Sequence, residues 1–323
     1  MTLLISKVNQ LGDNVVYLPV VQSLVKAHPD WRIVVMTSPT AARLYEVCCP
    51  GVEVRPCETA KFNGAWRRPW ALARLAAEWR ALKPDACLLG DDQGNVAHLL
   101  ARLSGAKLSV GPQTPYVRLN ALVRHRVAPA EDEFVALHNW RIARSQFDLP
   151  EMMPPPDLGA FGRDASDAIV IHAGASREYQ RWPMERYVEL ANRLAETHAV
   201  RWIAQAEDAG LSAAVERVRT ASLDDLVRVI AGARLFIGNN SGPMHIAAAC
   251  GTPGVIVVGP SSPRWDPVWR TERYDLLREP RLSCQPCDTA TQPANRCGNL
   301  ETPMACLRRW TVDAVHERVK KRL

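Results

Sequence analysis

The sequence lacks the features that mark a membrane-spanning or a disordered chain. In its 323 residues no apolar run approaches the roughly 18 residues that cross a bilayer, and there is no low-complexity tract or short-period repeat. Hydrophobic residues make up 47% of the chain and charged residues 23%, so substantial cores can be buried. An integral membrane protein is therefore excluded, and the length suits two domains of about 150 residues.

An export signal and a concentrated block of basic residues are also missing. The start, Met1–Lys7, has too short an apolar stretch for a signal peptide and no small-residue cleavage site. The net charge of +6 arises from 40 Lys and Arg against 34 Asp and Glu, which suits an anionic ligand or an anionic membrane surface rather than nucleic acid. We therefore expect a cytoplasmic protein with no nucleic-acid partner.

Short apolar runs alternate with helix-length segments along the whole chain. Runs such as Ala86–Leu89 and Gly254–Val258 are continuously apolar, as in strands of a parallel sheet that helices cover on both faces. Three prolines at 154–156 interrupt the alternation and predict a stiff connector. The pattern predicts two α/β domains, 1–153 and 154–323, with parallel sheets facing across a cleft.

The loop Asn9–Asn14 joins a predicted buried strand to a helix, at the sheet edge where ligands of such folds bind. Gly12 allows a tight turn, which places Asp13 at the N-terminus of the helix. Two interpretations stay open: Asp13 or Asn14 caps the helix, or Asp13 accepts a proton from an incoming hydroxyl group. Pro19 either kinks the helix or marks its start.

Two loops of the second half carry groups that suit a phosphorylated sugar. A small-residue turn, His172–Arg177, exposes backbone N–H groups, and Ser176, Arg177 and Arg181 add side-chain donors. Glu207 follows the next strand. It either accepts hydrogen bonds from sugar or ribose hydroxyls or is a carboxylate in the first turn of a helix.

The strongest signal is the segment Phe236–His245, where a buried strand ends in two asparagines and a helix begins at Ser241, Gly242 and a proline. The N–H groups of such a helix N-terminus can hold a diphosphate. His245 can donate to the same oxygens or to a sugar hydroxyl. A well-capped helix with a core histidine would explain Ser241 and the proline, but not the two asparagines, Asn239 and Asn240, or Gly242.

These segments together resemble the heptosyltransferase-like inverting glycosyltransferases of family nine. The resemblance covers nearly the whole chain and rests on an ordered set of motifs: Leu11–Asp13, His172–Ser176, Arg181–Pro183, Gly238–Ala249, Gly251–Pro253 and Gly259-Pro260. It implies a GT-B fold of two Rossmann-like domains. The N-terminal domain would bind the acceptor, and the C-terminal domain a nucleotide-sugar donor, commonly ADP-heptose.

The resemblance also implies individual roles. Asp13 falls on the catalytic base, Ser176 on a phosphate-contacting position and Glu207 on a donor-binding acidic residue. The diphosphate-binding loop is matched by Ser241, Gly242, Met244 and His245. The chain departs from the family pattern at Asn240, where the family usually has Asp, and at Gln180, where it often has Lys. Arg177 or Arg181 then becomes the expected phosphate cation.

The leading expectation is an inverting transferase that moves a heptose or a related sugar without a catalytic metal. Its acceptor would be a hydroxyl group of the lipopolysaccharide core, or a Ser or Thr of a surface protein. The alternatives are a nucleotide-sugar epimerase of similar fold and a catalytically inactive nucleotide-sugar-binding protein.

Nine cysteines in a chain without an export signal favour a reducing compartment. Four of them lie in the segment 284–306 with the spacing C-x2-C-x9-C-x8-C: Cys284, Cys287, Cys297 and Cys306. Four thiolates can hold zinc or iron in a tetrahedron, so the sequence predicts a structural metal site, with free thiols or disulfides as the alternatives. Such a metal would stabilise the structure of the loop rather than take part in sugar transfer.

The segment Trp66–Trp70 mixes two tryptophans with two arginines. It suits an anionic, sugar-rich acceptor or peripheral contact with the inner membrane, or it is a solvated loop at the cleft edge. The same basic character continues at Arg118, Arg124 and Arg126. Asp91 and Asp92 follow a predicted strand and either contact acceptor hydroxyls or cap a helix.

Overall fold

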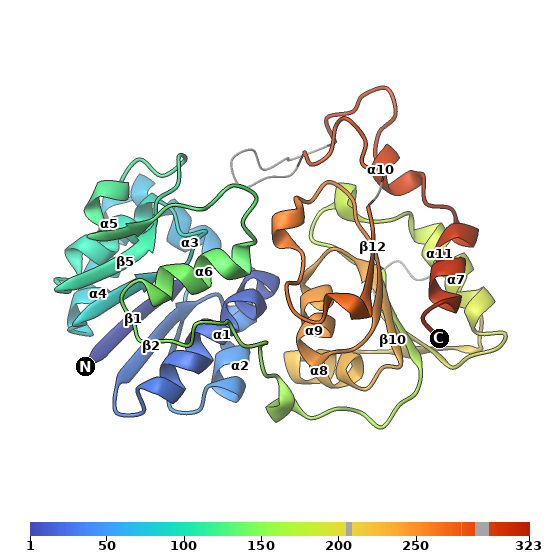
Figure 1. Cartoon of the computed structure of the whole chain (residues 1–323), viewed down its shortest axis with the longest axis horizontal. Helices are drawn as coiled ribbons and strands as arrows, with labels where there is room; N and C mark the ends of the chain where they lie inside the picture. Colours follow the sequence, from blue (N-terminus) through green and yellow to red (C-terminus); the bar gives the residue numbers. More distant parts are fainter. Residues whose placement is uncertain (205–208, 279, 288–296) are drawn as a thin grey trace. The chain divides into compact units, whose positions relative to one another are not determined.

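The chain forms two compact units, Met1–Asp157 and Leu158–Leu323, each of which is described by itself (Figure 1). The computed structural model describes residues 1–204, 209–278, 280–287 and 297–323. Each unit contains a six-stranded sheet in which neighbouring strands run parallel. The predicted α/β class with parallel sheets is therefore confirmed.

The sheet of the first unit has the strand order β3-β2-β1-β4-β5-β6. Its strands are β1 Thr2–Lys7, β2 Arg32–Thr37, β3 Glu53–Pro56, β4 Ala86–Leu89, β5 Leu108–Pro112 and β6 His125–Val127. Its helices are α1 Leu11–Ala27, α2 Pro39–Cys48, α3 Thr59–Gly64, α4 Pro69–Ala81, α5 Asn95–Leu103 and α6 Val135–Arg144. Because β1 lies between β2 and β4, Leu3, Leu4 and Ile5 are completely buried, as expected for an inner strand of a parallel sheet.

Helix α1 contains a proline in its interior. A proline lacks the backbone N–H and usually kinks or ends a helix, yet α1 continues from Leu11 to Ala27 with Pro19 buried inside it. The interpretation of Pro19 as the start of the helix is therefore wrong. Residues that follow the β1 loop directly, including Gly12 and Asp13, already belong to the first turn of α1.

The sheet of the second unit has the strand order β12-β11-β10-β7-β8-β9. Its strands are β7 Ile169–His172, β8 Val200–Ile203, β9 Val215–Val218, β10 Leu235–Asn239, β11 Gly254–Val257 and β12 Tyr274–Leu277. Its helices are α7 Met184–Leu194, α8 Leu223–Ala231, α9 Gly242–Cys250, α10 Ala305–Arg308 and α11 Val312–Lys320. Short 3₁₀ turns in the two units lie at Ala65–Arg67, Asn120–Leu122, Gly159–Phe161, Glu178–Gln180, Pro263–Trp265 and Thr271–Arg273.

The last helix of the chain completes the core of the second unit. Val315 and Val319 of α11 are completely buried and share one apolar cluster with Leu190 of α7 and Trp202 of β8. Figure 1 shows α11 beside α7 at the red end of the chain. Across the described ranges, no helix combines the length and the apolar character that a bilayer crossing requires.

Candidate active site

The loops that follow β1 and β4 meet around Lys7. This side chain is completely buried, with its Nζ 2.7 Å from Asp92 Oδ2 and 3.3 Å from Asp91 Oδ1. Burial disfavours the ammonium form, but the carboxylates of Asp92 and Asp91 more than offset this and raise the pKa of Lys7 above its ordinary value. Lys7 is therefore charged, and we refer to Lys7, Asp91 and Asp92 as the Lys7 cluster.

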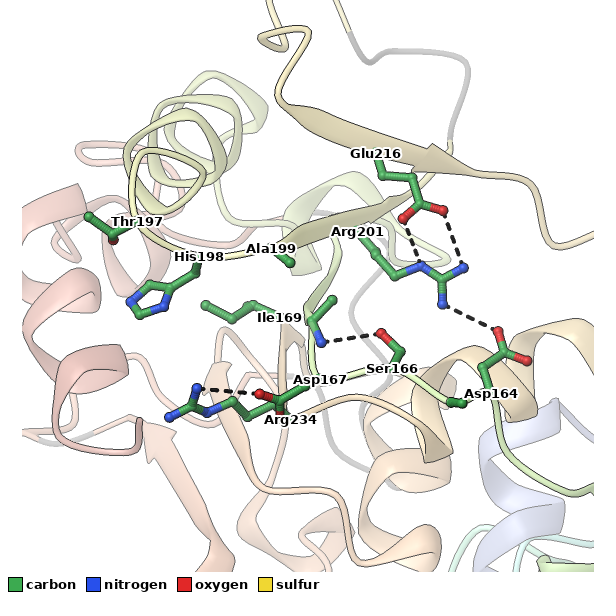
Figure 2. A pocket seen from close by; sticks show the side chains of 12 residues that line it. Asp164, Ser166, Asp167, Ile169, Thr197, His198, Ala199, Arg201, Glu216 and Arg234 are labelled. Atoms are coloured by element: carbon green, nitrogen blue, oxygen red, sulfur yellow. Dashed lines mark hydrogen bonds and ion pairs between the residues drawn. The ribbon is translucent and has the colours of Figure 1, made fainter.

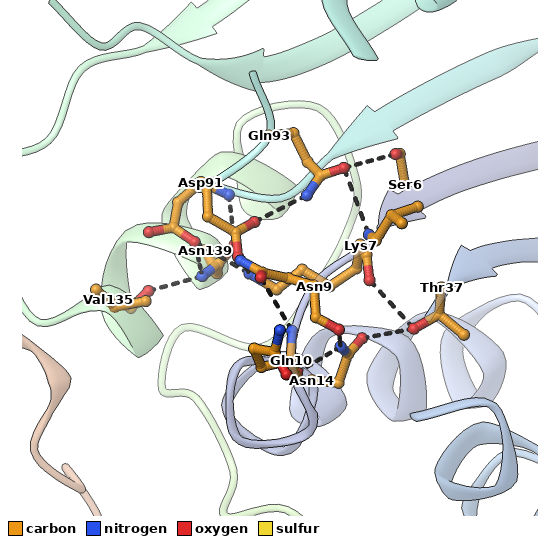
Figure 3. Close-up of polar contacts among 12 residues, drawn as sticks. Ser6, Lys7, Asn9, Gln10, Asn14, Thr37, Asp91, Gln93, Val135 and Asn139 are labelled. Carbon is orange, nitrogen blue, oxygen red and sulfur yellow. Dashed lines mark hydrogen bonds and ion pairs between the residues drawn. The ribbon is translucent and has the colours of Figure 1, made fainter. Parts of the chain in front are cut away.

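Amide side chains hold both carboxylates of the Lys7 cluster in place (Figure 3). Asn139 of α6 donates to Asp91 Oδ1 at 2.7 Å and accepts from the Asp91 backbone N–H at 2.9 Å. Asn9 donates to Asp92 Oδ2, and Gln93 donates to Asp92 Oδ1 at 3.0 Å. Helix α5 takes Gly94 as its N-cap, so the helix-capping interpretation of the two aspartates is wrong.

Asn14 fixes the start of α1 to its neighbours. Its Nδ2 donates to the carbonyl groups of Asn9 and Gln10 at 3.1 and 2.8 Å. Its Oδ1 accepts from Thr37 Oγ1 at 2.9 Å and from the Tyr45 hydroxyl at 2.8 Å. Because the N-cap position of α1 is Gln10, neither Asn14 nor Asp13 is the N-cap.

Asp13 lies half-buried in the first turn of α1. Burial raises its pKa, the nearby Asp92 carboxylate raises it further, and Lys7 partly compensates, so that the pKa of Asp13 stands at about 7. A carboxyl group with this pKa exchanges its proton near neutral pH. That property fits a general base better than a structural cap.

Among the described residues, no side chain caps the N-terminus of α9 in the second unit. Ser241 occupies the N-cap position, but its side chain accepts no hydrogen bond from the first turn, and its hydroxyl donates to the Asn239 carbonyl at 3.3 Å. The interpretation of Ser241 as a helix cap is therefore wrong. Gly242 and Pro243 begin the helix, and the positive end of its dipole faces outward from the first turn.

His245 lies in the first turn of α9 and is 95% buried, with a relative exposure of 5%. In the described part of the chain its Nδ1 has no hydrogen-bond partner. Burial lowers the pKa of His245 to about 4, so the ring is neutral at pH 7 and has one N–H to donate. Its neighbour Met244 is completely buried and packs inside the unit.

Asn239 joins the loops after β7 and β10, a role that sequence reasoning missed. It donates to the Ala173 carbonyl at 2.8 Å and accepts from the Trp182 backbone N–H at 2.8 Å. The residue is completely buried at the last position of β10. The signal in the sequence that could have identified this role is a polar residue at the end of an otherwise apolar strand.

The predicted phosphate-binding residues lie together on the loop between β7 and α7. Ser176 is exposed, and its hydroxyl donates to Gln180 Oε1 at 3.3 Å. Arg177 donates to the Tyr179 hydroxyl, and Arg181 donates from Nε to the Ala175 carbonyl at 2.9 Å. Glu207, the remaining predicted donor contact, lies outside the described residues.

Asn240 contacts a buried ion pair that the sequence analysis did not anticipate. Its Nδ2 donates to Asp266 Oδ1 at 3.4 Å. Asp266 in turn accepts two hydrogen bonds from the guanidinium group of Arg278, at 2.5 and 2.7 Å, and both side chains are less than a tenth exposed. The amide at 240 therefore faces a carboxylate from a distant part of the unit.

The expectation of a structural metal at the four cysteines is not supported. Within the ranges that the structure describes, no three His, Cys, Asp or Glu side chains are placed to hold a metal ion, and none of the nine cysteines is in a disulfide. Cys297 Sγ accepts from the Met304 backbone N–H at 3.2 Å. Burial, followed by the neighbouring Cys287, Cys297 and Cys284 thiols, raises the pKa of Cys306 to about 11, so Cys306 is protonated at neutral pH.

A cavity of about 670 Å³ lies at the opposite ends of the strands of the second sheet, where β7 and β8 begin. Its cations are already paired, as Figure 2 shows: Arg201 with Asp164 and Glu216, and Arg234 with Asp167. The loops that follow β7 and β10 do not line it. This cavity is therefore not part of the candidate active site.

Comparison with known proteins places these features in a family context. The family model "Glycosyltransferase family 9 (heptosyltransferase)" matches residues 97–297. Lipopolysaccharide heptosyltransferase 1 of Escherichia coli K12 is 26% identical over 297 residues, which cover 81% of this chain and 89% of the relative. Lipopolysaccharide heptosyltransferase 2 of the same strain is 37% identical over 164 residues, covering 42% of this chain and 47% of the relative. The structure of E. coli heptosyltransferase WaaC with ADP covers 100% of both chains with a TM-score of 0.74 at 18% identity, a likeness of fold.

Proposed function

Because this chain belongs to glycosyltransferase family 9, we propose that it transfers a heptose, or a closely related sugar, from ADP-heptose to a hydroxyl group of the lipopolysaccharide core. Similar proteins are named lipopolysaccharide heptosyltransferases, and the similar structure contains ADP. A Ser or Thr hydroxyl of a surface protein is the second acceptor class. The observation that carries the proposal is Asp13, a carboxyl group whose pKa of about 7 suits a base.

The first unit is the proposed acceptor domain, with Asp13 as the general base. Just above neutral pH a carboxyl group with this pKa is mostly ionised and can take the proton of an attacking hydroxyl group. Asp13 is not the N-cap residue of α1, although its carboxylate accepts a hydrogen bond from the backbone N–H of Gln10, which lowers its pKa slightly. A well-placed general base contributes roughly 10²–10⁴-fold to the rate.

The second unit is the proposed donor domain. The uncapped N-terminus of α9, at Ser241 and Gly242, offers backbone N–H groups and a positive dipole end to the diphosphate. Neutral His245 donates a further hydrogen bond, and Arg177 or Arg181 supplies a cation. The remaining proposed donor contacts are Ser176, Glu207, Asn240 and Met244.

The proposed reaction is a direct displacement with inversion. The acceptor oxygen attacks the anomeric carbon while the bond between that carbon and the diphosphate oxygen breaks, and the bonding electron pair leaves with the nucleoside diphosphate. The hydroxyl proton moves to Asp13. The N–H groups and cation of the second unit stabilise the negative charge that grows on the leaving group.

Replacing Asp13 with Asn tests the proposed base. We expect Asp13→Asn to lower kcat for transfer from ADP-heptose at least a hundredfold, because the amide cannot accept the proton. The Kd for ADP should stay within about twofold, since Asp13 belongs to the proposed acceptor domain. Asp30→Asn, an exposed aspartate of the same unit, is the matched control.

The same assay separates the alternatives. Conversion of the nucleotide-sugar in the absence of any acceptor would favour an epimerase. Binding of ADP-heptose without transfer to either acceptor class would favour an inactive binding protein. Wild-type turnover in Asp13→Asn would remove Asp13 from the mechanism.

The Trp66–Trp70 segment is the proposed contact with an anionic membrane surface, at the cytoplasmic face of the inner membrane. Trp66 and Trp70 are 61% and 65% exposed, and the Arg67 guanidinium lies 5.1 Å from the centre of the Trp66 ring. In the described ranges no carboxylate pairs with Arg67 or Arg68. Exposed tryptophans beside unpaired arginines suit the interface between headgroups and acyl chains.

Vesicle sedimentation tests this surface. We expect the protein to bind vesicles that contain phosphatidylglycerol more than vesicles of phosphatidylcholine alone, and 0.5 M salt to weaken the binding. Trp66→Ala combined with Trp70→Ala should reduce binding about tenfold or more. Arg74→Gln, an exposed arginine already paired with Glu78, should change it little. Equal binding to both kinds of vesicle would contradict the proposal.

A further inference from the structure

The proposed transfer leaves one charged side chain without a role. Lys7 is completely buried, so it cannot itself reach an acceptor or a phosphate from its present position. A fully buried lysine is rare unless it is paired, and replacing such an ion pair with apolar side chains of similar volume is often neutral or stabilising. Stability alone is therefore a weak reason for a charged group in the interior of this sheet.

The surrounding chain is built to admit this lysine. Gly90 precedes the two aspartates, and a Cβ atom on Gly90 would lie 2.7 Å from Lys7 Cδ, closer than real Cβ contacts allow. Because Gly90 has no side chain, there is room for the Lys7 side chain to extend to the end of β4. Ser6 donates to Gln93 Oε1 at 2.8 Å, which connects the two loops a second time (Figure 3).

We propose that Lys7 and Asp92 are positioning residues of the transfer reaction: Lys7 holds the β4 carboxylates beside Asp13 and compensates their charge, so that Asp13 is ionised when the acceptor arrives. This inference rests on the proposed role of Asp13. In this role the Lys7 cluster keeps the pKa of Asp13 close to neutral pH, which requires opposite charges to be held at fixed distances.

The direction of each electrostatic effect follows from the sign of the charge. The Asp92 carboxylate disfavours a second negative charge on Asp13 and raises its pKa, whereas the Lys7 ammonium favours that charge and lowers it. Burial raises the pKa of Asp92 and Lys7 lowers it, with a net lowering, so Asp92 is ionised at neutral pH. Removing Lys7 and removing Asp92 should therefore act on Asp13 in opposite directions.

The other titratable groups packed around Asp13 do not supply a competing charge. Burial raises the pKa values of Tyr17 of α1 and Tyr45 of α2 well above their usual value, so both are neutral. His138 of α6 acts on the Lys7 cluster itself, and it lies 3.0 Å from the Val127 carbonyl through Nε2. The charge that Asp13 experiences is set by the Lys7 cluster.

The test is the pH profile of kcat/KM for transfer from ADP-heptose, measured on the full chain. The wild-type acidic limb should have its midpoint near pH 7. Lys7→Met should move that midpoint up by about one pH unit or more, and Asp92→Asn should move it down by about one pH unit. The double variant should return it to within about half a unit of wild type. Lys107→Met, an exposed lysine at the start of β5, should leave the profile unchanged.

A merely structural role predicts a different result. If Lys7→Met and Asp92→Asn both lose activity equally at every pH, with the midpoint unmoved, the inference is overturned. Should Lys7→Met fail to fold, Asp92→Asn still decides through the downward movement of its midpoint. The Asp13→Asn variant distinguishes a failure of the proposed base from a failure of the positioning role. Full turnover in Asp13→Asn would show that Asp13 is not the base. If Asp13→Asn loses turnover but Lys7→Met and Asp92→Asn leave the midpoint of the pH profile unchanged, only the positioning role is contradicted.

Discussion

Asn240 is one of the two positions, with Gln180, at which the sequence analysis finds a departure from the pattern of the family that the chain resembles. Asn240 donates to Asp266, whose carboxylate already forms a buried ion pair with Arg278. A carboxylate at position 240 would face Asp266 at about the same distance as the present amide, and the single arginine would have to compensate two negative charges. The ion pair therefore explains why an amide is well suited to this position in this particular chain.

This explanation predicts the effect of restoring the usual residue. Asn240→Asp should weaken ADP binding about tenfold, because it adds a negative charge beside the diphosphate site and strains the Asp266 pair. The Kd of ADP from calorimetry is the measurement. Asn240→Ala removes the hydrogen bond without adding charge, and should weaken binding less than Asn240→Asp. Tighter binding in Asn240→Asp would show that Asp266 does not determine the choice at 240.

At the scale of elements, the strand-to-loop junctions depend on small residues that admit neighbouring side chains. Gly238 lies in β10 next to β7, and a Cβ atom there would come within 2.9 Å of the Phe236 ring and 3.1 Å of the His172 carbonyl. The backbone oxygen cannot move without disturbing the sheet. The spacing between β7 and β10, and with it the loops of the proposed donor site, therefore depends on this glycine.

We expect Gly238→Ala to destabilise the second unit by about 1–3 kcal/mol through overpacking. This corresponds to a decrease in Tm of roughly 2–12 °C, measured by calorimetry. The matched control is Gly298→Ala in the same unit, since no atom of the described residues lies within 4 Å of a Cβ atom at Gly298. A Tm for Gly238→Ala equal to that of the control would mean that the two strands separate easily to admit the methyl group.

Most of the apolar strands could be predicted, because a strand that is buried on both faces is continuously apolar in the sequence. The predicted strand Ala86–Leu89 matches β4, and the predicted strand Gly254–Val258 contains β11, Gly254–Val257. The sequence analysis missed β6, β9 and β12, which lie at three of the four sheet edges. An edge strand has only one neighbour and needs no continuous apolar run, so the apolar signal used for the other strands is weak there.

The candidate site could be predicted only in part, for a related reason. Asp13, Ser241 and His245 stood out because they lie in motifs that are local in sequence. Lys7 and Asp266 did not, because their roles depend on partners brought close by the fold: Asp92 is 85 positions from Lys7, and Arg278 reaches Asp266 from beyond β12. Preferences of residue types for the N-cap position were also an unreliable guide, since Gln10 and not Asp13 is the N-cap of α1, and the Ser241 side chain does not cap α9.

For the whole molecule, the division of labour between the two units is the central proposal. The proposed diphosphate-binding groups all belong to Leu158–Leu323, whereas the proposed base belongs to Met1–Asp157. A nucleoside diphosphate lacking the sugar should therefore act on the second unit, where α9 has no side-chain cap and the Nδ1 atom of the buried His245 has no partner among the described residues. Buried His98 and His138 of the first unit also lie in first helical turns, but their ring nitrogens contact backbone carbonyl groups.

Hydrogen exchange with ADP tests this division directly. We expect ADP at a hundredfold excess over its Kd to stabilise the second unit by ~2.7 kcal/mol and to slow amide exchange by up to about a hundredfold, most strongly in the first turn of α9 and in the loop after β7. Exchange in β1 and α1 should change far less. AMP, which lacks the second phosphate, is the control and should protect the α9 amides weakly. Protection by ADP centred on the loop after β1 would instead assign the nucleotide to the first unit and reverse the proposed roles.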